Sequence, residues 1–150
     1  MSNNQIILNG CIEQFKEANE LAKSDSQIFE LFSLTQTTKQ IELSFEDIEN
    51  SIVDGGNDGG IDSIIVLVDD ANIIALEDLD EIKFSNKTSV RIIISQCKRE
   101  NSFKELSLDK LITTIPELFN LEKSEDALLV RFNPDIVEKG LISREAWKRC

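Results

Sequence analysis

The sequence predicts an α/β or α+β domain in which a small mixed β-sheet is flanked by helical segments. Three observations lead to this class. Apolar residues recur at helical spacing near both ends of the chain, two β-branched apolar runs lie between them, and a glycine-rich turn precedes the first run. We expect a single domain that is helical over 1–51, has its core sheet in 52–99 and is helical again over 102–150.

The chain opens with three predicted helices, at about 5–23, 26–38 and 44–51. The segment Ser24-Asp25-Ser26 offers an N-cap for the second helix. Ser44 is followed three residues later by Asp47, the pattern of a capping box at the start of the third. These local signals place a helical layer before the sheet.

The predicted strands lie at about 61–68, 73–76 and 89–96. The glycine-rich loop, residues 54–60, holds four of the six glycines and must form a turn before the first strand. Residues 69–72 predict a hairpin turn into the second strand, and a charged segment at about 77–87 separates it from the third.

Helical spacing returns at 103–120, where Pro116 predicts a break or a kink near the end of the helix. Residues 124–132 fit either a strand or a helix start, and Asn133 marks the boundary of a last helix. Trp147 is expected in the core or at an interface. The sequence stops inside this last helical pattern, so we expect a fragment of a longer protein.

Composition excludes several kinds of chemistry. The chain has no histidine, which rules out within it a Ser-His-Asp triad or a zinc site that uses histidine. The three cysteines are far apart and lack CxxC spacing, so we expect a reducing cytoplasm and no disulfide framework. Any metal would therefore be bound by oxygen ligands, as magnesium, manganese and calcium are. Neither a membrane span nor a secretory signal is predicted.

The formal net charge is −12, and it is unevenly distributed. Residues 1–82 contain 3 basic and 18 acidic side chains, whereas residues 83–150 contain 13 and 10. Such a balance disfavours tight, non-specific binding of a nucleic-acid duplex by this chain alone. Contacts to nucleic acid would have to use the basic second half, a bound metal or a partner.

Two short segments combine into a candidate site. One is Asp58-Gly59-Gly60-Ile61-Asp62, which brings an aspartate to the start of a buried strand. The other is Ser95-Gln96-Cys97-Lys98, which ends the most apolar strand. Because side chains alternate along a strand, we expect Gln96 and Lys98 on one face and Cys97 pointing away. A divalent cation could then bind Asp62, the Gln96 amide oxygen and the Cys97 carbonyl, while Lys98 stabilises charge on a phosphate.

The nearby charged residues leave alternatives open. Asp58 is equally well a further metal ligand or a turn former, and Asp54 is expected to be a turn former. Arg99, Lys104 and Lys110 follow the site and fit either phosphate contacts or a solvated helix face.

The order of these segments resembles the PD-(D/E)XK, or restriction-endonuclease-like, nucleases. The Gln-x-Lys form, QCKR at 96–99, resembles the Mrr-like branch. The run IVDGGNDGGIDSI at 52–64 is similar to the N-terminal domain of AIPR (abortive phage infection) proteins. In these families a preceding helix commonly carries a glutamate, and FELF at 29–32 matches that pattern. The resemblance implies Glu30, Asp62, Gln96 and Lys98 as catalytic residues.

The resemblance also implies a function. It predicts a Mg²⁺-dependent, or Mn²⁺-dependent, endonuclease that cuts phosphodiester bonds in DNA, with RNA left open, in cytoplasmic anti-phage defence. Further domains of a longer chain, or a homodimer partner, would supply most of the affinity. Gln96 replaces the usual acid of the superfamily, and an amide binds magnesium more weakly. A catalytically inactive nuclease fold used for binding or assembly, and an acidic α/β interaction domain, remain alternatives.

Overall fold

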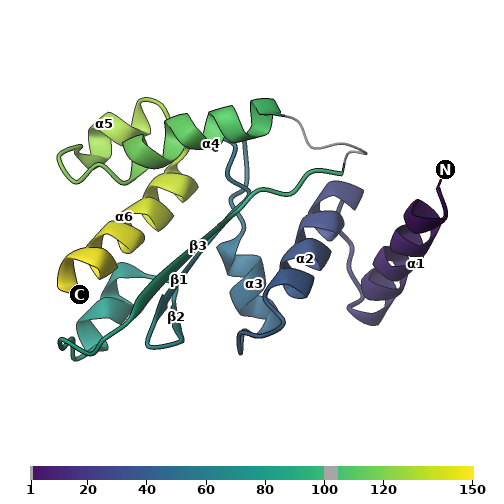
Figure 1. The fold of residues 1–150 in the computed structure, drawn as a ribbon, viewed down its shortest axis with the longest axis horizontal. Coiled ribbons are helices and arrows are strands. Elements are labelled where there is room, and N and C mark those ends of the chain that lie inside the picture. The colour runs from purple at the N-terminus through teal and green to yellow at the C-terminus, as the bar shows by residue number, and fades with distance from the viewer. Residues whose placement is uncertain (1, 100–104) are drawn as a thin grey trace.

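The computed structural model describes residues 2–99 and 105–150, in which helices surround a three-stranded antiparallel sheet (Figure 1). The elements, in chain order, are α1 (Asn3–Ala18), α2 (Asp25–Thr37), α3 (Phe45–Ser51), β1 (Ser63–Val68), β2 (Ala71–Ile73), the 3-10 helix η1 (Leu76–Glu81), β3 (Val90–Ser95), α4 (Glu105–Leu118), α5 (Glu125–Leu129) and α6 (Pro134–Arg149). The fold class is therefore α+β, in agreement with the coarse prediction.

The predicted helix caps are present at the start of the chain. The Ser44 hydroxyl accepts the Asp47 N–H at 3.0 Å, and the Asp47 carboxylate accepts the Ser44 N–H at 2.8 Å. Ser24 and Gln27 form the equivalent box at α2. Both helices consequently begin where the sequence places them.

The first helix is shorter than predicted. It ends at Ala18 rather than near residue 23, because Glu20 adopts a left-handed φ of 51°. The Leu21 N–H then bonds back to the Lys16 carbonyl at 3.0 Å, which satisfies a helix-end acceptor. Residues 19–23 form the turn into α2.

The sheet has the order β2-β1-β3, and both strand pairs are antiparallel. The predicted mixed sheet is therefore wrong for the described residues. β1 pairs along its whole length with β3, from Ser63 opposite Ser95 to Val68 opposite Val90. This register brings the start of β1 beside the end of β3.

The β1–β2 turn is tighter than the predicted four residues. Asp69 and Asp70 both have left-handed φ values, 49° and 68°, as a two-residue hairpin turn requires. The second strand consequently begins at Ala71 and ends at Ile73, earlier than the predicted 73–76. Much of the predicted charged segment that follows forms η1.

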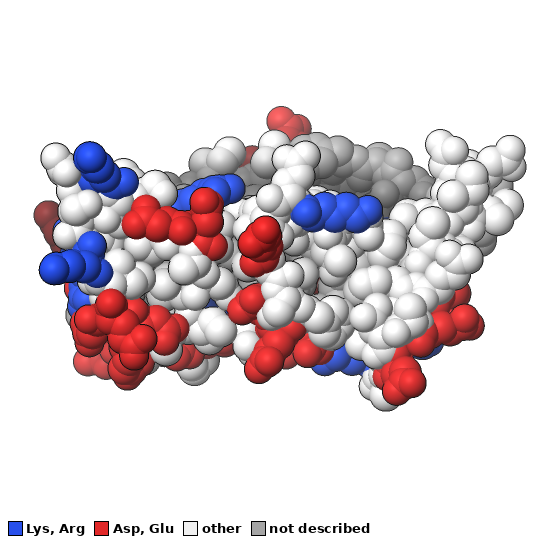
Figure 2. Space-filling model, turned by 90° about the horizontal axis from the view of Figure 1, so that it is seen from below, with Lys and Arg blue, Asp and Glu red and all other residues white. Residues whose placement is uncertain are grey.

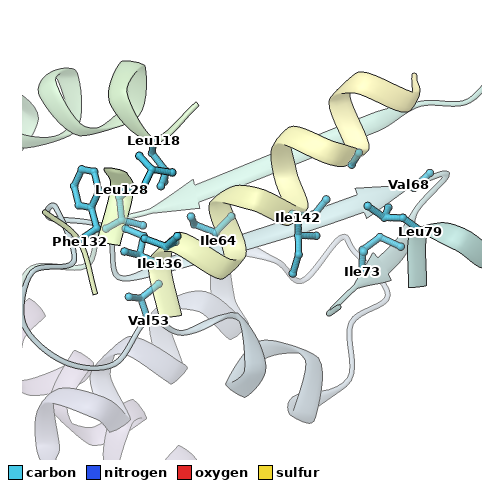
Figure 3. Close-up of a cluster of buried hydrophobic side chains, with 14 residues drawn as sticks. Val53, Ile64, Val68, Ile73, Leu79, Leu118, Leu128, Phe132, Ile136 and Ile142 are labelled. Carbon is cyan, nitrogen blue, oxygen red and sulfur yellow. The ribbon is translucent and has the colours of Figure 1, made fainter. Parts of the chain in front are cut away.

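The main core lies between the sheet and α6 (Figure 3). Alternate residues of β1, Ile64 and Val66 among them, pack with Ile136 and Ile142 of α6 and with Leu118 of α4. The other residues of β1 are buried as well, so this strand has protein on both faces. A smaller cluster of Leu31, Leu34 and Ile48 joins α2 to α3.

The open choice at 124–132 resolves as a helix. Ser124 caps α5 by accepting the Ala127 N–H at 3.3 Å. Asn133 caps α6 in the same way through the Ile136 N–H, as predicted. α4 corresponds to the predicted helix at 103–120, and its first two predicted residues lie outside the described ranges. Trp147 is 65% exposed, so it is not a core residue.

Among the described helices, none is both long and apolar enough to cross a lipid bilayer.

Candidate functional site

The glycine-rich loop delivers Asp62 to β1 by passing close under α4. Gly59 and Gly60 have φ values of 66° and 83°, which residues with a Cβ disfavour. A Cβ on Gly59 would lie 2.4 Å from Thr114 Cγ2, and one on Gly60 would lie 3.1 Å from Lys110 Cβ. Glycine is required at both positions by conformation and by space.

Hydrogen bonds fix this loop to two helices. The Thr114 hydroxyl of α4 donates to the Gly59 carbonyl at 2.7 Å. The Asn133 side-chain amide, at the start of α6, donates to the Gly56 carbonyl at 2.9 Å. The loop is thereby held in a fixed position relative to α4 and α6.

Asp58 makes the contact of a turn former. Its Oδ1 atom accepts the Gly60 N–H at 2.7 Å, an Asx-type turn within the loop. Its negative charge also raises the pKa of Asp62, so the two carboxylates are electrostatically coupled.

Asp62 is held at the point where β1 begins and β3 ends. Its N–H donates to the Ser95 carbonyl at 2.9 Å, and its own carbonyl accepts the Val53 N–H at 2.9 Å. Its Oδ2 atom accepts a short hydrogen bond from the Cys97 N–H. The position and the orientation of the carboxylate are both fixed by main-chain contacts.

Glu30 and Lys98 share the electrostatic surroundings of Asp62. Burial raises the pKa of Glu30, and the Asp62 charge raises it further. Burial also raises the pKa of Asp62, against the opposing effects of the Cys97 N–H and the Lys98 ammonium. The Lys98 charge favours the ionised form of both acids. Asp62 and Lys98 therefore lie close enough to Glu30 to shift its pKa, and Lys98 lies close enough to Asp62 to do the same there.

Cys97 follows β3, which ends at Ser95, and its thiol lies near the two acids and Ser33 of α2. Burial raises the pKa of the Cys97 thiol to about 11, with further increases from Asp62 and Glu30 and a hydrogen bond from Ser33 acting against them. The side chain therefore lies on the side of the two acids, as a neutral thiol at physiological pH.

Gln96 is directed to the loop. A Cβ built on Gly60 would lie 3.2 Å from its Nε2 atom, so the amide packs against the glycine beside Lys110. Within residues 2–99 and 105–150, no hydrogen bond joins Gln96 to Asp62, and no group of three or more acidic, cysteine or histidine side chains is arranged to hold a metal. The register that pairs Ser63 with Ser95 brings Gln96 beside Asp62, so the convergence of these two side chains on one cation stays a prediction.

The two remaining basic predictions within the described ranges have different surroundings. The Arg99 guanidinium donates to the Asn9 side chain of α1 at 2.9 Å, which links the end of the sheet to the first helix. Lys110 lies over Gly60 on α4. Lys104 lies outside the described residues.

A hollow of about 580 Å³ lies against the loop. Its walls come from the loop, from α4 and from the junction of α5 with α6, and they include Gly59, Gly60, Lys110, Thr113 and Arg131. It adjoins the acidic site, because Gly60 has Lys110 and Gln96 as neighbours and precedes Asp62 by two residues.

Sequence reasoning missed two parts of this region. Ser33 lies three residues after Glu30, one helical turn along the same face, and that spacing is a signal for its place beside the site. The hollow has no comparable sequence signal, because it depends on how α4 and α6 pack around the loop.

No family model, curated protein or solved structure matches this chain.

Proposed function

We propose that this chain is a metal-dependent nuclease module, with a restriction-endonuclease-like core, that hydrolyses phosphodiester bonds in DNA. The observation that carries the proposal is the Asp62 carboxylate, which main-chain bonds hold where β1 begins and β3 ends, with Glu30 and Lys98 in its surroundings. The three residues occur in the order that resembles the PD-(D/E)XK nucleases. A role in anti-phage defence belongs to the same proposal and rests on the resemblance alone.

The oxygen donors of the site fit a hard divalent cation such as Mg²⁺ or Mn²⁺. Burial raises the pKa values of Glu30 and Asp62, so their joint ionisation is unfavourable unless a positive charge offsets it. Both carboxylates would hold the cation, with the Gln96 amide oxygen as a neutral ligand after a change of side-chain rotamer. When bound, the cation would polarise the phosphate and lower the pKa of an attacking water.

The protein's own residues position and stabilise charge. The Cys97 N–H orients the Asp62 carboxylate, and Lys98 keeps both acids closer to their ionised forms. In a substrate complex the Lys98 ammonium would stabilise negative charge on the phosphate oxygens. None of these roles requires histidine, which the chain lacks.

One observation favours a second function, a nuclease fold that binds nucleic acid or assembles without cutting. Asp62 Oδ2 already accepts the Cys97 N–H, and Asp58 Oδ1 accepts the Gly60 N–H. Both predicted metal-binding aspartates thus use an oxygen internally. Cutting and binding are separated by the same experiment.

The test is a cleavage assay with Mn²⁺ or Mg²⁺ on DNA and RNA, using Asp62→Asn and Lys98→Gln. Asp25→Asn, on the exposed first turn of α2, and Lys87→Gln, on the exposed segment before β3, provide matched charge controls. We expect losses of about 10²-fold or more for the two site variants, the scale of removing one stabilising group. Both controls should keep the wild-type rate.

Three results are informative. Cleavage that survives both site variants would overturn the proposal and indicate a contaminant or a different centre. Binding of Mn²⁺ that Asp62→Asn abolishes, without any cleavage, would establish the inactive version. A protein that neither binds the metal nor cuts would overturn the nuclease proposal and leave the non-cutting fold.

A further inference from the structure

The hollow beside the glycine-rich loop shares a wall with the acidic site. Asp58, Gly59 and Gly60 line the hollow, and the next residues of the chain carry Asp62 into β1. A substrate strand that presents a phosphate to Asp62 would therefore pass the loop residues that also line this hollow.

The walls of the hollow carry two acidic and two basic side chains, Asp58, Asp109, Lys110 and Arg131. Lys110 packs its stem on Gly60, leaving its ammonium exposed, and it forms no ion pair with another described residue. Arg131 is instead engaged by Glu117, and its guanidinium carbon lies 5.5 Å from the centre of the Phe132 ring. Lys110 is thus the cation of the hollow that is available to a ligand.

The size of the hollow favours one nucleotide over a duplex. About 580 Å³ lies within the range of small-ligand pockets, roughly 300–1,000 Å³. A base within a duplex cannot enter such a space unless it leaves its stack.

The surface charge also disfavours the binding of a duplex. Figure 2 shows acidic side chains gathered in clusters over one face of the molecule, with basic side chains few and separated. Together with a net charge of −12, this opposes the many phosphate contacts that a duplex surface needs. A single cationic position at a pocket is compatible with binding through one strand.

From this geometry we infer that the hollow receives an unpaired nucleotide next to the cut position, with Lys110 on its phosphate, so that the substrate is single-stranded or locally unpaired nucleic acid. The inference rests on the nuclease function proposed above, because that function places the cut position at Asp62 and so defines where the strand enters the hollow. The acceptance of a nucleotide by the hollow is measurable without cleavage.

The test is fluorescence anisotropy in EDTA with a short labelled oligothymidylate, the matching oligouridylate and a hairpin duplex. Variants are Lys110→Gln, with Lys87→Gln as the matched charge control, and Thr113→Glu. Lys87, Lys110 and Thr113 are all exposed, so these changes leave the core intact.

We expect either oligonucleotide to bind about tenfold or more tightly than the duplex, a difference of about 1.4 kcal/mol. Lys110→Gln should reduce the slope of log K against log salt by about 0.7, the value for one phosphate contact on a single strand. Thr113→Glu should weaken binding, whereas Lys87→Gln should leave it unchanged. The thymidylate and uridylate arms show whether the sugar matters.

Equal or tighter binding of the duplex would overturn the inference. So would an unchanged salt slope in Lys110→Gln, or equal effects of Lys110→Gln and Lys87→Gln. Lys110-dependent binding of single strands without cleavage would sustain the pocket and overturn only the nuclease function. Cleavage that both Lys110→Gln and Thr113→Glu leave at the wild-type rate would sustain the nuclease and overturn the pocket.

Discussion

Replacing Asp62 by asparagine should stabilise the metal-free protein near neutral pH while abolishing metal binding. Burial raises the pKa of Asp62, and the Asp58 charge raises it further, so the ionised carboxylate is disfavoured in the fold. Asparagine is neutral and nearly isosteric, and its side-chain oxygen still accepts the Cys97 N–H. A functional acid would thus be replaced by a more stable neutral side chain.

The pH dependence has a defined sign. An acid whose pKa is higher in the folded than in the unfolded state stabilises the fold below the unfolded pKa. That contribution is lost as the pH rises through the folded pKa. The advantage of Asp62→Asn should therefore be absent below about pH 4, the ordinary range of an aspartate, and complete once the raised pKa is passed.

The hydrogen bond from the Cys97 N–H to Asp62 allows the size of the stability change to be judged against a second variant, Asp62→Ala. Asp62→Ala removes the same charge but leaves the half-buried Cys97 N–H without its acceptor, which costs about 1–3 kcal/mol. The cavity left by alanine adds to that cost. At about pH 8 in EDTA we therefore expect the free energy of unfolding to be highest for Asp62→Asn, intermediate for the wild type and lowest for Asp62→Ala.

The assay is urea unfolding followed by circular dichroism, at about pH 4 and about pH 8 and with and without Mn²⁺. Added Mn²⁺ should raise the midpoint of the wild type and leave that of Asp62→Asn unchanged. The exposed Asp25→Asn should match the wild type throughout. An asparagine variant less stable than the wild type at the higher pH would refute the reasoning, because burial would then be outweighed by the charged form of the hydrogen bond.

Two further predictions concern reactivity and packing. Because burial raises the pKa of Cys97 to about 11, its thiol should react with a disulfide reagent far more slowly than the two exposed cysteines; equal rates for all three would show that the site is open. Gly140→Ala should lower the free energy of unfolding by about 1–2 kcal/mol, since its Cβ would lie 2.6 Å from Leu118 Cδ1 and overpacking outweighs the gain in helix propensity. Gly10→Ala, with no atom within 4 Å of its Cβ, should instead raise it by about 0.5–1 kcal/mol; unfolding midpoints that move together would contradict this contrast.

Local signals made much of the fold predictable. The capping box at Ser44 and the cap at Asn133 act between residues three apart, so the sequence contains the whole interaction. The apolar run of β1 is buried on both faces, as its continuous pattern predicts.

The errors in the predicted elements arose where single residues adopt unusual backbone conformations or where tertiary packing determines the secondary structure. Left-handed φ values at Glu20, Asp69 and Asp70 shortened a helix and tightened a hairpin, and non-glycine residues adopt this region only in particular contexts. In 124–132, Leu128 and Phe132 are buried and Val130 is 89% exposed, a spacing that suits a helical turn against α6.

The candidate site was predictable as a set of residues and not as a geometry. The β1–β3 register brings Asp62 to the end of β3, and this much follows from two antiparallel strands. The neighbours of Gln96 and Cys97 do not follow, because they depend on how α4 and α2 pack beside the end of β3.

The glycine-rich loop both positions the Asp62 carboxylate and forms a wall of the hollow. At Gly59 the loop lies against Thr114 so closely that a Cβ would force it away from α4, and the Thr114 hydroxyl bond fixes the same contact. Moving the loop outward would shift Asp62 relative to β3 and change the wall of the hollow at the same time. The two glycines therefore couple the placement of the carboxylate to the shape of the pocket, so the proposed cutting and the inferred nucleotide binding depend on one short stretch of backbone.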